Sequence, residues 1–371
     1  MTDARATLAV LGGGQLGRML GLAGIPLGVR FRFLDPSPDA PAAAVGDLVV
    51  GGLGDEGALA EVSAGADVVT YEWEGVPATA AELLARRLPV RPGARPLEVS
   101  QDRLVEKDTC RALGIGTPEY RAVDSRASLD DAVAATALPA VLKTRRGGYD
   151  GKGQFVLRAA GDADAAWAEL GGPEVALVLE AFVPFDRELS VVAVRGLDGA
   201  IACWPVVENV HRDGILRVTR APAPDLDRDT EHAAEQIATK LLTELDHVGV
   251  LAIELFDVGG VVLANELAPR VHNSGHWTIE GAVTSQFENH VRAVLGLPLG
   301  DTAARGAAAM VNCIGAIPDP AAVLAVPGAH LHDYGKTPRT GRKVGHVTVV
   351  ADTPADRDTR LSQLLASQDR T

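Results

Sequence analysis

Within residues 1–99, short runs of consecutive apolar residues alternate with stretches in which apolar residues recur every three or four positions. Unbroken apolar runs are typical of strands covered on both faces, and the wider spacing is typical of amphipathic helices. Such runs predict strands at residues 7–11, 47–50 and 67–71, and a further strand is predicted at 29–34, where Arg30 and Arg32 interrupt the apolar residues. Between the first two strands, one helix face would carry Leu16, Met19, Leu20 and Ala23. We expect an open, mostly parallel α/β domain.

A helix is predicted to begin near residue 100, where the pattern of apolar and polar residues along the chain changes. Ser100 can act as its N-cap, and Gly114 provides a stop signal. Its apolar side would consist of Leu104, Cys110 and Leu113.

Beyond this helix, short apolar runs follow one another with turn signals between them, as in antiparallel sheets. Strands are expected at residues 140–143, 176–180, 189–194, 200–205, 250–256, 261–267, 308–314 and 346–351, and a long helix at 229–245. We therefore expect a parallel α/β domain over residues 1–99, a mixed α+β domain over 100–300 and a small β-rich domain over 301–371.

Composition restricts the class of function. The formal net charge of −14 opposes nonspecific nucleic-acid binding, which needs a basic surface. The three cysteines are far apart and form no C-x-x-C pair, which favours a reducing compartment and no structural zinc. The chain has no basic and hydrophobic leader and no apolar stretch of about 20 residues. We expect a soluble cytoplasmic protein.

A glycine-rich turn follows the first predicted strand. Residues 12–17 read G-x-G-x-x-G, and Asp35 ends the second strand, as in dinucleotide-binding folds. An NAD-dependent oxidoreductase is therefore one interpretation. However, Asp35 begins a rigid Asp-Pro-Ser-Pro turn, and no hydride-transfer pocket can be named later in the chain. We favour a pocket for an anionic or nucleoside-like ligand at the helix N-terminus.

A second glycine-rich segment, residues 143–154, lies between two apolar runs. It contains four glycines, begins with Lys143 and carries Lys152 near its end. Glycines let backbone N–H groups approach an anion, and lysines supply point charges for phosphate oxygens. The alternative is an ordinary surface hairpin.

Two glutamates stand in neighbouring apolar runs at equal distances from Gly260. If the turn is centred there, Glu254 and Glu266 face each other with Cβ atoms about 5 Å apart. Two such carboxylates repel unless a cation or proton lies between them, and Asn265 adds a neutral oxygen. Hard oxygen ligands of this kind suit Mg²⁺. The alternative is that both glutamates face solvent.

Two further segments are rich in polar groups. Residues 270–277 combine Arg, His, Asn and Ser without helical spacing, which is typical of an active-site loop. We interpret Arg270 and His272 as anion and substrate contacts, with a structural loop as the alternative. Residues 336–343 form a basic turn that either closes a phosphate pocket or is a solvated hairpin tip, and charge alone does not decide between these.

Six motifs follow one another along the chain: G-G-G-Q-L-G-R-M (12–19), T-Y-E-W-E (70–74), G-G-Y-D-G-K-G-Q (147–154), N-E-x-A-P-R-V-H-N-S-G-H-W-T (265–278), T-S-Q-F-E-N-H (284–290) and Y-G-K (334–336). Together they resemble the ATP-grasp superfamily, and within it the family of N5-carboxyaminoimidazole ribonucleotide synthases, the ATP-dependent carboxylases of purine biosynthesis. The resemblance implies an ATP-grasp architecture with an N-terminal Rossmann-like parallel-sheet domain and a small C-terminal β-rich domain. It also implies a homodimer.

The resemblance implies a set of ligand contacts. Those to ATP would be Arg103, Lys143, Gly148, Tyr149, Asp150, Gly151, Lys152, Gly153, Gln154, Glu180, Ala181, Phe182, Val183, Glu188, His211, Asn265 and Glu266. Those to the ribonucleotide would be Gln15, Leu16, Glu72, Tyr149, Asp150, Arg270, His272, Lys336 and Arg342. Glu254 and Glu266 would ligate one or two Mg²⁺ ions.

The implied reaction begins with phosphorylation of bicarbonate by ATP. Carboxyphosphate, or the CO₂ that it releases, is then captured by the exocyclic amine of aminoimidazole ribonucleotide. Lys143 would neutralise phosphoryl charge, Arg270 would grip bicarbonate, and Asp150 or His272 would accept the amine proton. The alternatives are another ATP-grasp ligase such as a formate-dependent glycinamide ribonucleotide transformylase, the NAD-dependent oxidoreductase, and a noncatalytic nucleotide-binding regulator.

Overall fold

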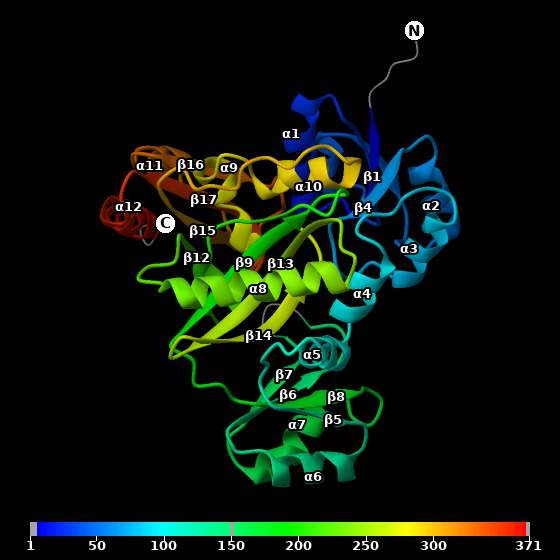
Figure 1. Cartoon of the computed structure of the whole chain (residues 1–371), viewed down its shortest axis with the longest axis vertical. Helices are drawn as coiled ribbons and strands as arrows, with labels where there is room; N and C mark the ends of the chain where they lie inside the picture. Colours follow the sequence, from blue (N-terminus) through cyan, green and yellow to red (C-terminus); the bar gives the residue numbers. More distant parts are fainter. Residues whose placement is uncertain (1–5, 149–151, 369–371) are drawn as a thin grey trace.

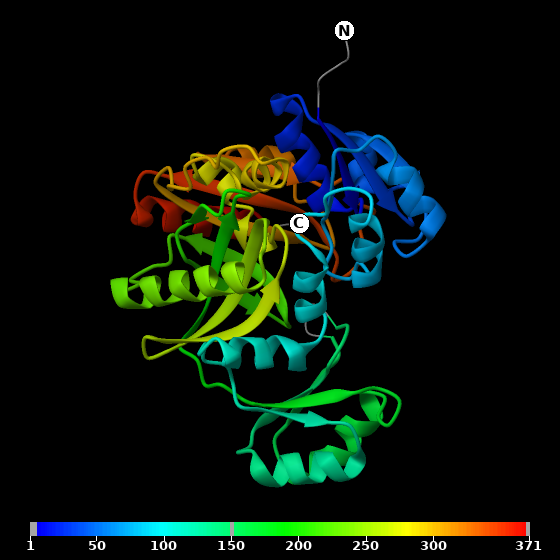
Figure 2. The same cartoon turned by 45° about the vertical axis from the view of Figure 1, so that its right-hand side comes forward.

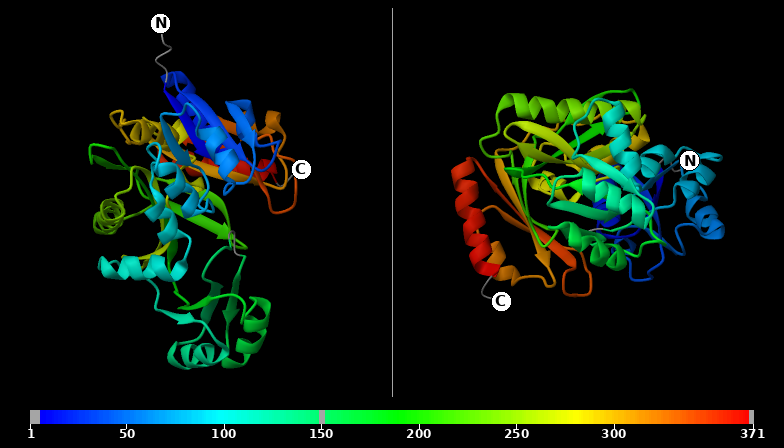
Figure 3. Two further views of the ribbon diagram at one scale, coloured as in Figure 1. Left: turned by 90° about the vertical axis from the view of Figure 1, so that its right-hand side faces the viewer. Right: turned by 90° about the horizontal axis from the view of Figure 1, so that it is seen from below.

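The computed structural model describes residues 6–148 and 152–368. Along its longest axis, an N-terminal parallel sheet and a small antiparallel sheet lie at opposite ends, with a large sheet between them (Figures 1 and 2). The small sheet stands out from the rest of the molecule (Figure 3). Within the described residues, every helix is too short or too polar to pass through a lipid bilayer.

The N-terminal sheet is entirely parallel, as predicted. Its order is β3-β2-β1-β4, with bounds Thr7–Leu11 (β1), Arg30–Asp35 (β2), Asp47–Val50 (β3) and Val68–Tyr71 (β4). The helical segments are α1 (Gln15–Gly24), η1 (Ile25–Leu27), η2 (Pro41–Ala44), α2 (Glu56–Ser63) and α3 (Ala78–Ala85). α1 buries Leu16, Met19 and Leu20 and packs against α10 (Gln286–Leu295), as Figure 1 shows.

Two short helices follow instead of the single one expected, and the predicted N-cap was wrong. Ser100 ends α4 (Ala94–Ser100), and its hydroxyl donates back to the carbonyl of Leu97. α5 (Arg103–Ala112) is capped by Asp102, whose carboxylate accepts from the N–H of Leu104 at 3.1 Å. The carboxylate can cap this helix and also pair with Arg145 at 2.8 Å, which a serine hydroxyl cannot do.

The small sheet is antiparallel, in the order β5-β8-β6-β7. Its strands are β5 (Tyr120–Val123), β6 (Ala140–Thr144), β7 (Gln154–Leu157) and β8 (Leu177–Ala181). Its helical segments are α6 (Arg126–Ala135), η3 (Ala160–Asp162) and α7 (Ala163–Glu169). Because β6 and β7 pair up to Lys143 and Gln154, the second glycine-rich segment is the connection of a hairpin.

The large sheet has nine strands in the order β14-β13-β9-β11-β12-β15-β17-β16, with β10 on β9. Their bounds are Arg187–Arg195 (β9), Ile201–Cys203 (β10), Val207–Arg212 (β11), Ile215–Ala221 (β12), Gly249–Val258 (β13), Val261–Ala268 (β14), Ala307–Ile314 (β15), Ala329–Asp333 (β16) and Lys343–Ala351 (β17). The remaining helical segments are α8 (Arg228–Glu244), η4 (Asn273–Gly275), α9 (Thr278–Gly281), α11 (Pro320–Leu324) and α12 (Pro354–Gln368). The C-terminal strands therefore continue the large sheet through the β12–β15 pairing.

Helices cover both faces of β9 and β13. Val192 and Val194 pack with α10, whereas Val191 and Ala193 pack with α8. This two-sided burial explains why the sequence shows an unbroken apolar run there.

His290 of α10 joins the N-terminal domain to the large sheet. Its Nε2 lies 2.8 Å from the hydroxyl of Thr70, and its Nδ1 accepts from the N–H of Val250 at 3.1 Å. Burial lowers the pKa of His290 to about 3, so the imidazole is neutral in the folded protein.

The stability that His290 contributes should therefore disappear in acid. In the unfolded chain a histidine takes up its proton near pH 6.5, so the unfolded state is favoured as the pH falls below that value. His290→Gln, which keeps one donor and one acceptor, should be less stable than the wild type at pH 7.5. This gap in unfolding free energy should narrow by about 2 kcal/mol between pH 7.5 and 5. Urea unfolding at both pH values measures it. The exposed His232→Gln is the control and should change the unfolding free energy at pH 7.5 by less than about 0.5 kcal/mol.

Candidate active site

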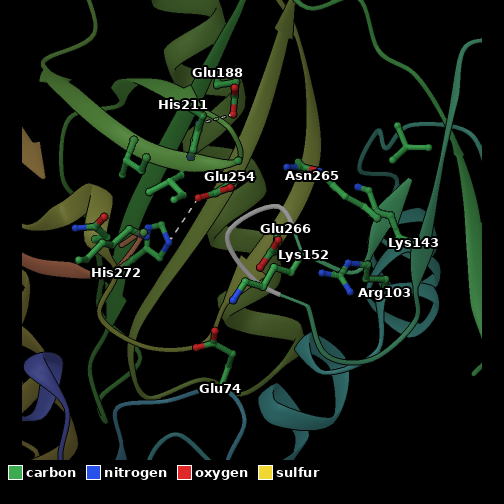
Figure 4. Close-up of a pocket in the computed structure, with 18 of the residues that line it drawn as sticks. Glu74, Arg103, Lys143, Lys152, Glu188, His211, Glu254, Asn265, Glu266 and His272 are labelled. Carbon is green, nitrogen blue, oxygen red and sulfur yellow. Dashed lines mark ion pairs between the residues drawn. The ribbon is translucent and has the colours of Figure 1, made fainter. Parts of the chain in front are cut away.

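A cavity of about 970 Å³ lies where the small sheet, the large sheet, the N-terminal domain and the β16–β17 connection meet (Figure 4). Of the residues expected in the site, its lining includes Gln15, Leu16, Arg103, Lys143, Lys152, Gln154, Glu180, Ala181, Phe182, Val183, Glu188, His211, Glu254, Asn265, Glu266, Arg270, His272, Lys336 and Arg342. Glu72, Gly148 and Gly153 are not part of the lining. Tyr149, Asp150 and Gly151 lie outside the described residues.

Two lysines converge on one carboxylate at the small-sheet side of the cavity. Lys143 on β6 contacts Glu180 on β8 at 2.8 Å, and Lys107 on α5 reaches the other oxygen of Glu180 at 3.3 Å. Burial by itself would raise the pKa of Glu180, but the two ammonium groups hold it below its ordinary value. Lys107 was not among the predicted residues. The site thus has a fixed acidic group beside the Lys143 amine.

Arg103 holds the glycine-rich connection between β6 and β7 at the cavity. Its Nη1 donates to the carbonyls of Thr144 at 2.8 Å and Gly147 at 2.6 Å. Gly148 has φ +79°, and a Cβ there would lie 2.5 Å from the carbonyl oxygen of Lys152. Only glycine fits at this position, so the sequence pattern reflects a real backbone constraint.

Glu254 and Glu266 do pair directly across β13 and β14, as predicted. The geometric reason differs from the expected one. The turn consists of Gly259 and Gly260, since Val258 pairs with Val261, and this register alone would bring Asn265 opposite Glu254. A β-bulge next to Glu254 shifts the register by one residue. As a result, the consecutive residues Asn265 and Glu266 both line the cavity.

The paired glutamates are electrostatically strained. Burial, followed by repulsion from Glu266, raises the pKa of Glu254 to about 7. His272 faces the same carboxylate, with Nε2 3.5 Å from Oε1 of Glu254 (Figure 4). Burial and the nearby Arg270 lower the pKa of His272 well below its ordinary value, so the imidazole is neutral. A cation between the carboxylates would relieve the repulsion.

A second imidazole–carboxylate pair lies further along the large sheet. His211 Nδ1 is 2.7 Å from Glu188 (Figure 4). Burial opposes the charged imidazole, but the hydrogen bond to Glu188 raises the pKa of His211 overall. The pKa values of the two histidines that line the cavity are therefore shifted in opposite directions.

The glycine-rich turn after β1 binds the protein's own carboxylates. Glu72 accepts from the N–H groups of Gly14 at 2.8 Å and Gly17 at 3.0 Å, and Asp35 accepts from Gly13 at 2.9 Å. These are the N–H groups that a dinucleotide phosphate would need. The expected pocket for an anionic ligand at this helix N-terminus was therefore wrong, as was the dinucleotide site, because the protein's own carboxylates take up these N–H groups.

The neighbouring Glu74 was not among the predicted residues, yet it lines the cavity and forms an ion pair with Arg270. Sequence reasoning also missed the lining residues Trp73, Pro118, Val141, Val156, Phe185, Gly214, Ile215, Leu216 and Phe256. The lining residues Asn273, Arg339, Thr340, Gly341 and Lys343 lie in the two polar segments that it singled out. Among the missed residues, Phe185 and Phe256 stack with ring centroids 4.7 Å apart. The position of Phe256, two residues after Glu254 on one strand, was the available signal that it shares the same face.

The basic segment 336–343 does contribute to the cavity. Lys336, Arg339, Arg342 and Lys343 all line it, and Lys336 contacts the side-chain oxygen of Gln15 on α1. This segment therefore brings four cationic side chains to the same cavity as the paired acids Glu254 and Glu266.

Three domain families match the chain in order. The ribonucleotide synthetase preATP-grasp domain matches residues 5–101, the ATP-grasp domain matches 108–287, and the phosphoribosylaminoimidazole carboxylase C-terminal domain matches 308–360.

Relatives match over almost the whole length. N5-carboxyaminoimidazole ribonucleotide synthase of Pseudomonas aeruginosa is 51% identical over 359 residues, which cover 97% of this chain and 98% of that enzyme. The crystal structure of the synthetase from Thermus thermophilus superposes with a TM-score of 0.93 at 55% identity, covering 97% of this chain and 98% of that one. The Aspergillus clavatus enzyme in complex with ADP and 5-aminoimidazole ribonucleotide gives a TM-score of 0.92 at 31% identity, covering all of both chains.

Proposed function

The chain belongs to the family of N5-carboxyaminoimidazole ribonucleotide synthases, ATP-dependent ligases of the ATP-grasp superfamily, as its motifs predicted, and on this basis we propose how its residues carry out the reaction. ATP and bicarbonate give carboxyphosphate and ADP. The exocyclic amine of 5-aminoimidazole ribonucleotide then takes the carboxyl group, phosphate leaves, and the amine loses a proton. The observation that carries this proposal is the single cavity shared by Lys143, the Glu254–Glu266 pair and the basic segment 336–343.

ATP would lie between the small sheet and the large sheet. The apolar groups Val183, Phe256 and Phe182 suit a planar base, Glu188 suits a ribose hydroxyl, and the cations Lys143, Arg103 and Lys152 suit the phosphates. The fixed Glu180–Lys143 pair keeps the ammonium group in place, so it can neutralise charge without reorganising.

Mg²⁺ would be held by Glu254 and Glu266. Among residues 6–148 and 152–368, no three His, Cys, Asp or Glu side chains form a metal cluster, so the ion would complete its shell with phosphate oxygens and water. The raised pKa of Glu254 fits this assignment, because the pair is short of positive charge. When bound, the ion would supply charge stabilisation at the transferred phosphoryl group.

The ribonucleotide would lie at the other end of the cavity. Lys336 and Arg342 suit its phosphate, and Arg270 suits bicarbonate and the carboxylate that forms from it. Neutral His272 and Asp150 are the two candidates for accepting the amine proton. Water must be kept out, because carboxyphosphate hydrolyses readily.

The family also suggests the domain bounds, the oligomeric state and the cellular location of the protein. We propose domains at residues 1–99, 100–300 and 301–371, a homodimer, and a cytoplasmic location, where ATP and phosphorylated purine precursors occur. Sedimentation of the purified protein tests the dimer.

The proposed function is tested by ADP formation from ATP. Release should require bicarbonate and aminoimidazole ribonucleotide together, and mass spectrometry should detect the carboxylated nucleotide. Activation by formate and glycinamide ribonucleotide would instead indicate the transformylase. Protection against thermal unfolding by a nicotinamide cofactor, with none from ATP and Mg²⁺, would indicate the oxidoreductase.

Lys336→Ala should weaken ribonucleotide binding selectively. A charged hydrogen bond to phosphate is worth about 1.5–3 kcal/mol, so the KM for the ribonucleotide should rise about 10- to 100-fold. The KM for ATP should stay within about twofold, because the phosphates of ATP lie at the other lysines. Initial rates with each substrate varied in turn measure this. Lys240→Ala, on the exposed side of α8, is the control, and an equal change in both KM values would contradict the assignment.

A further inference from the structure

One buried amide holds the backbone of His272 from both sides. Gln286, the first residue of α10, is fully buried. Its Oε1 accepts from the N–H of His272 at 2.9 Å, and its Nε2 donates to the carbonyl of His272 at 2.6 Å. Residues in an antiparallel strand pair exchange the same two bonds. His272 lies in no strand, so Gln286 supplies what a neighbouring strand would otherwise provide.

Gln286 is itself fixed in one orientation. Its backbone N–H donates to the hydroxyl of Thr278 at 3.0 Å, and this hydroxyl donates to the carbonyl of Gly275 at 2.6 Å. The Nε2 atom also lies 3.2 Å from Nδ1 of His276. A Cβ on Gly275 would come within 2.6 Å of Oε1 of Gln286, so the loop closes tightly around the amide.

The held residue reaches directly into the cavity. The His272 ring is fixed at Nδ1 by the hydroxyl of Ser274 at 2.8 Å, and its Nε2 faces Glu254 at 3.5 Å. His272 lines the cavity, whereas Gln286 does not. Any effect of Gln286 on the chemistry must therefore pass through a neighbour.

We propose that Gln286 is a positioning residue for the carboxylation: it fixes the backbone from which the His272 imidazole meets Glu254. The inference rests on the proposed function, in which His272 and Glu254 both act. A ring that shifts by about 1 Å from its working position can lower a rate about 100-fold. A single amide bonded to both backbone groups of one residue prevents such a shift.

The same helix offers a matched control. Asn289 is also fully buried and holds Gly300 by the same pair of bonds. Its Oδ1 accepts from the N–H of Gly300 at 2.7 Å, and its Nδ2 donates to the carbonyl at 3.1 Å. Gly300 is not part of the cavity lining. The two amides therefore make the same pair of bonds to the backbone of one residue, but only Gln286 holds a residue that lines the cavity.

The test compares Gln286→Met, Asn289→Leu, His272→Ala and the double variant Gln286→Met/His272→Ala. For each, kcat and the KM for ATP are measured with bicarbonate and aminoimidazole ribonucleotide, together with the thermal unfolding midpoint. We expect both amide replacements to lower the midpoint. Of these two, only Gln286→Met should lower kcat, by about 30- to 100-fold, with the KM for ATP within about twofold. The double variant should be no slower than His272→Ala, because Gln286 would act only through the His272 side chain, which is already absent from that variant.

Two results would overturn the positioning role. One is a double variant whose loss is the product of the two single losses. The other is an equal loss of kcat in Asn289→Leu, which would indicate a general effect of lost rigidity. If Gln286→Met does not fold, Gln286→Glu enters the same cycle, since its carboxylate accepts from the His272 N–H but does not donate to the carbonyl. A wild-type protein without ribonucleotide-dependent ADP release would overturn the proposed function itself, whereas an active wild type with independent losses overturns only this inference.

Discussion

Replacing Glu266 by alanine is expected to lower ATP turnover at saturating nucleotide by at least about 10³-fold, because metal stabilisation of a phosphoryl transition state is worth several kcal/mol. Glu266 lies opposite Glu254 on the neighbouring strand and beside Asn265, and all three line the cavity. One carboxylate alone would hold Mg²⁺ too weakly to keep it at the transferred phosphate. The loss should therefore appear in kcat, and more ATP should not restore it.

ADP release measured across Mg²⁺ and ATP concentrations checks this expectation. Glu266→Gln, which keeps the shape and removes the charge, should lose turnover as well. Glu208→Ala is the control: its carboxylate stands on the same sheet and pairs with Arg220 at 2.9 Å, but it is not part of the lining. Full turnover by Glu266→Ala would refute the metal assignment.

The hairpin that carries this pair shows how far a sequence pattern reaches. The apolar runs and the two glycines predicted the strands and the facing glutamates correctly. They could not reveal the bulge, because the two runs lack a strict alternation of apolar and polar residues in which a shift by one residue would be visible. Yet it is the bulge that turns Asn265 and Glu266 to the same side. Sequence periodicity identified the strands, whereas the hydrogen-bond register decides which oxygens converge.

The acidic motif at residues 70–74 shows a second limit. Glu72 and Glu74 are the same residue type and stand two positions apart, so composition and spacing do not distinguish their roles. In the structure Glu72 accepts bonds from Gly14 and Gly17, while Glu74 lines the cavity and pairs with Arg270. The difference arises from the packing of α1 against this segment, which is a tertiary contact that no local pattern records.

Lys107 could not be foreseen for a related reason. It follows Glu106 on a short helix, and two adjacent charges are typical of an exposed face. In the structure both are buried: Glu106 accepts from the N–H of Leu267, and burial raises its pKa to about 8. Lys107 reaches Glu180 and also donates to the carbonyl of Asn265 at 3.3 Å. Thus α5 ties the small sheet to the hairpin of the paired glutamates.

Lys107→Met should lower the free energy of unfolding by about 3–5 kcal/mol, because it removes one partner of a buried charge. Methionine fills a similar volume, so the effect isolates the lost charge. Glu180 would then pair only with Lys143, and the carbonyl of Asn265 would lose its hydrogen bond from Lys107. Adding Glu180→Gln should recover part of the loss, because the double variant no longer buries an excess negative charge. Urea unfolding of both variants measures this, with the exposed Lys240→Met as a control expected within about 0.5 kcal/mol of the wild type. A single Lys107→Met variant as stable as the wild type would show that Lys143 alone balances the buried charge of Glu180, and would refute the role assigned to Lys107.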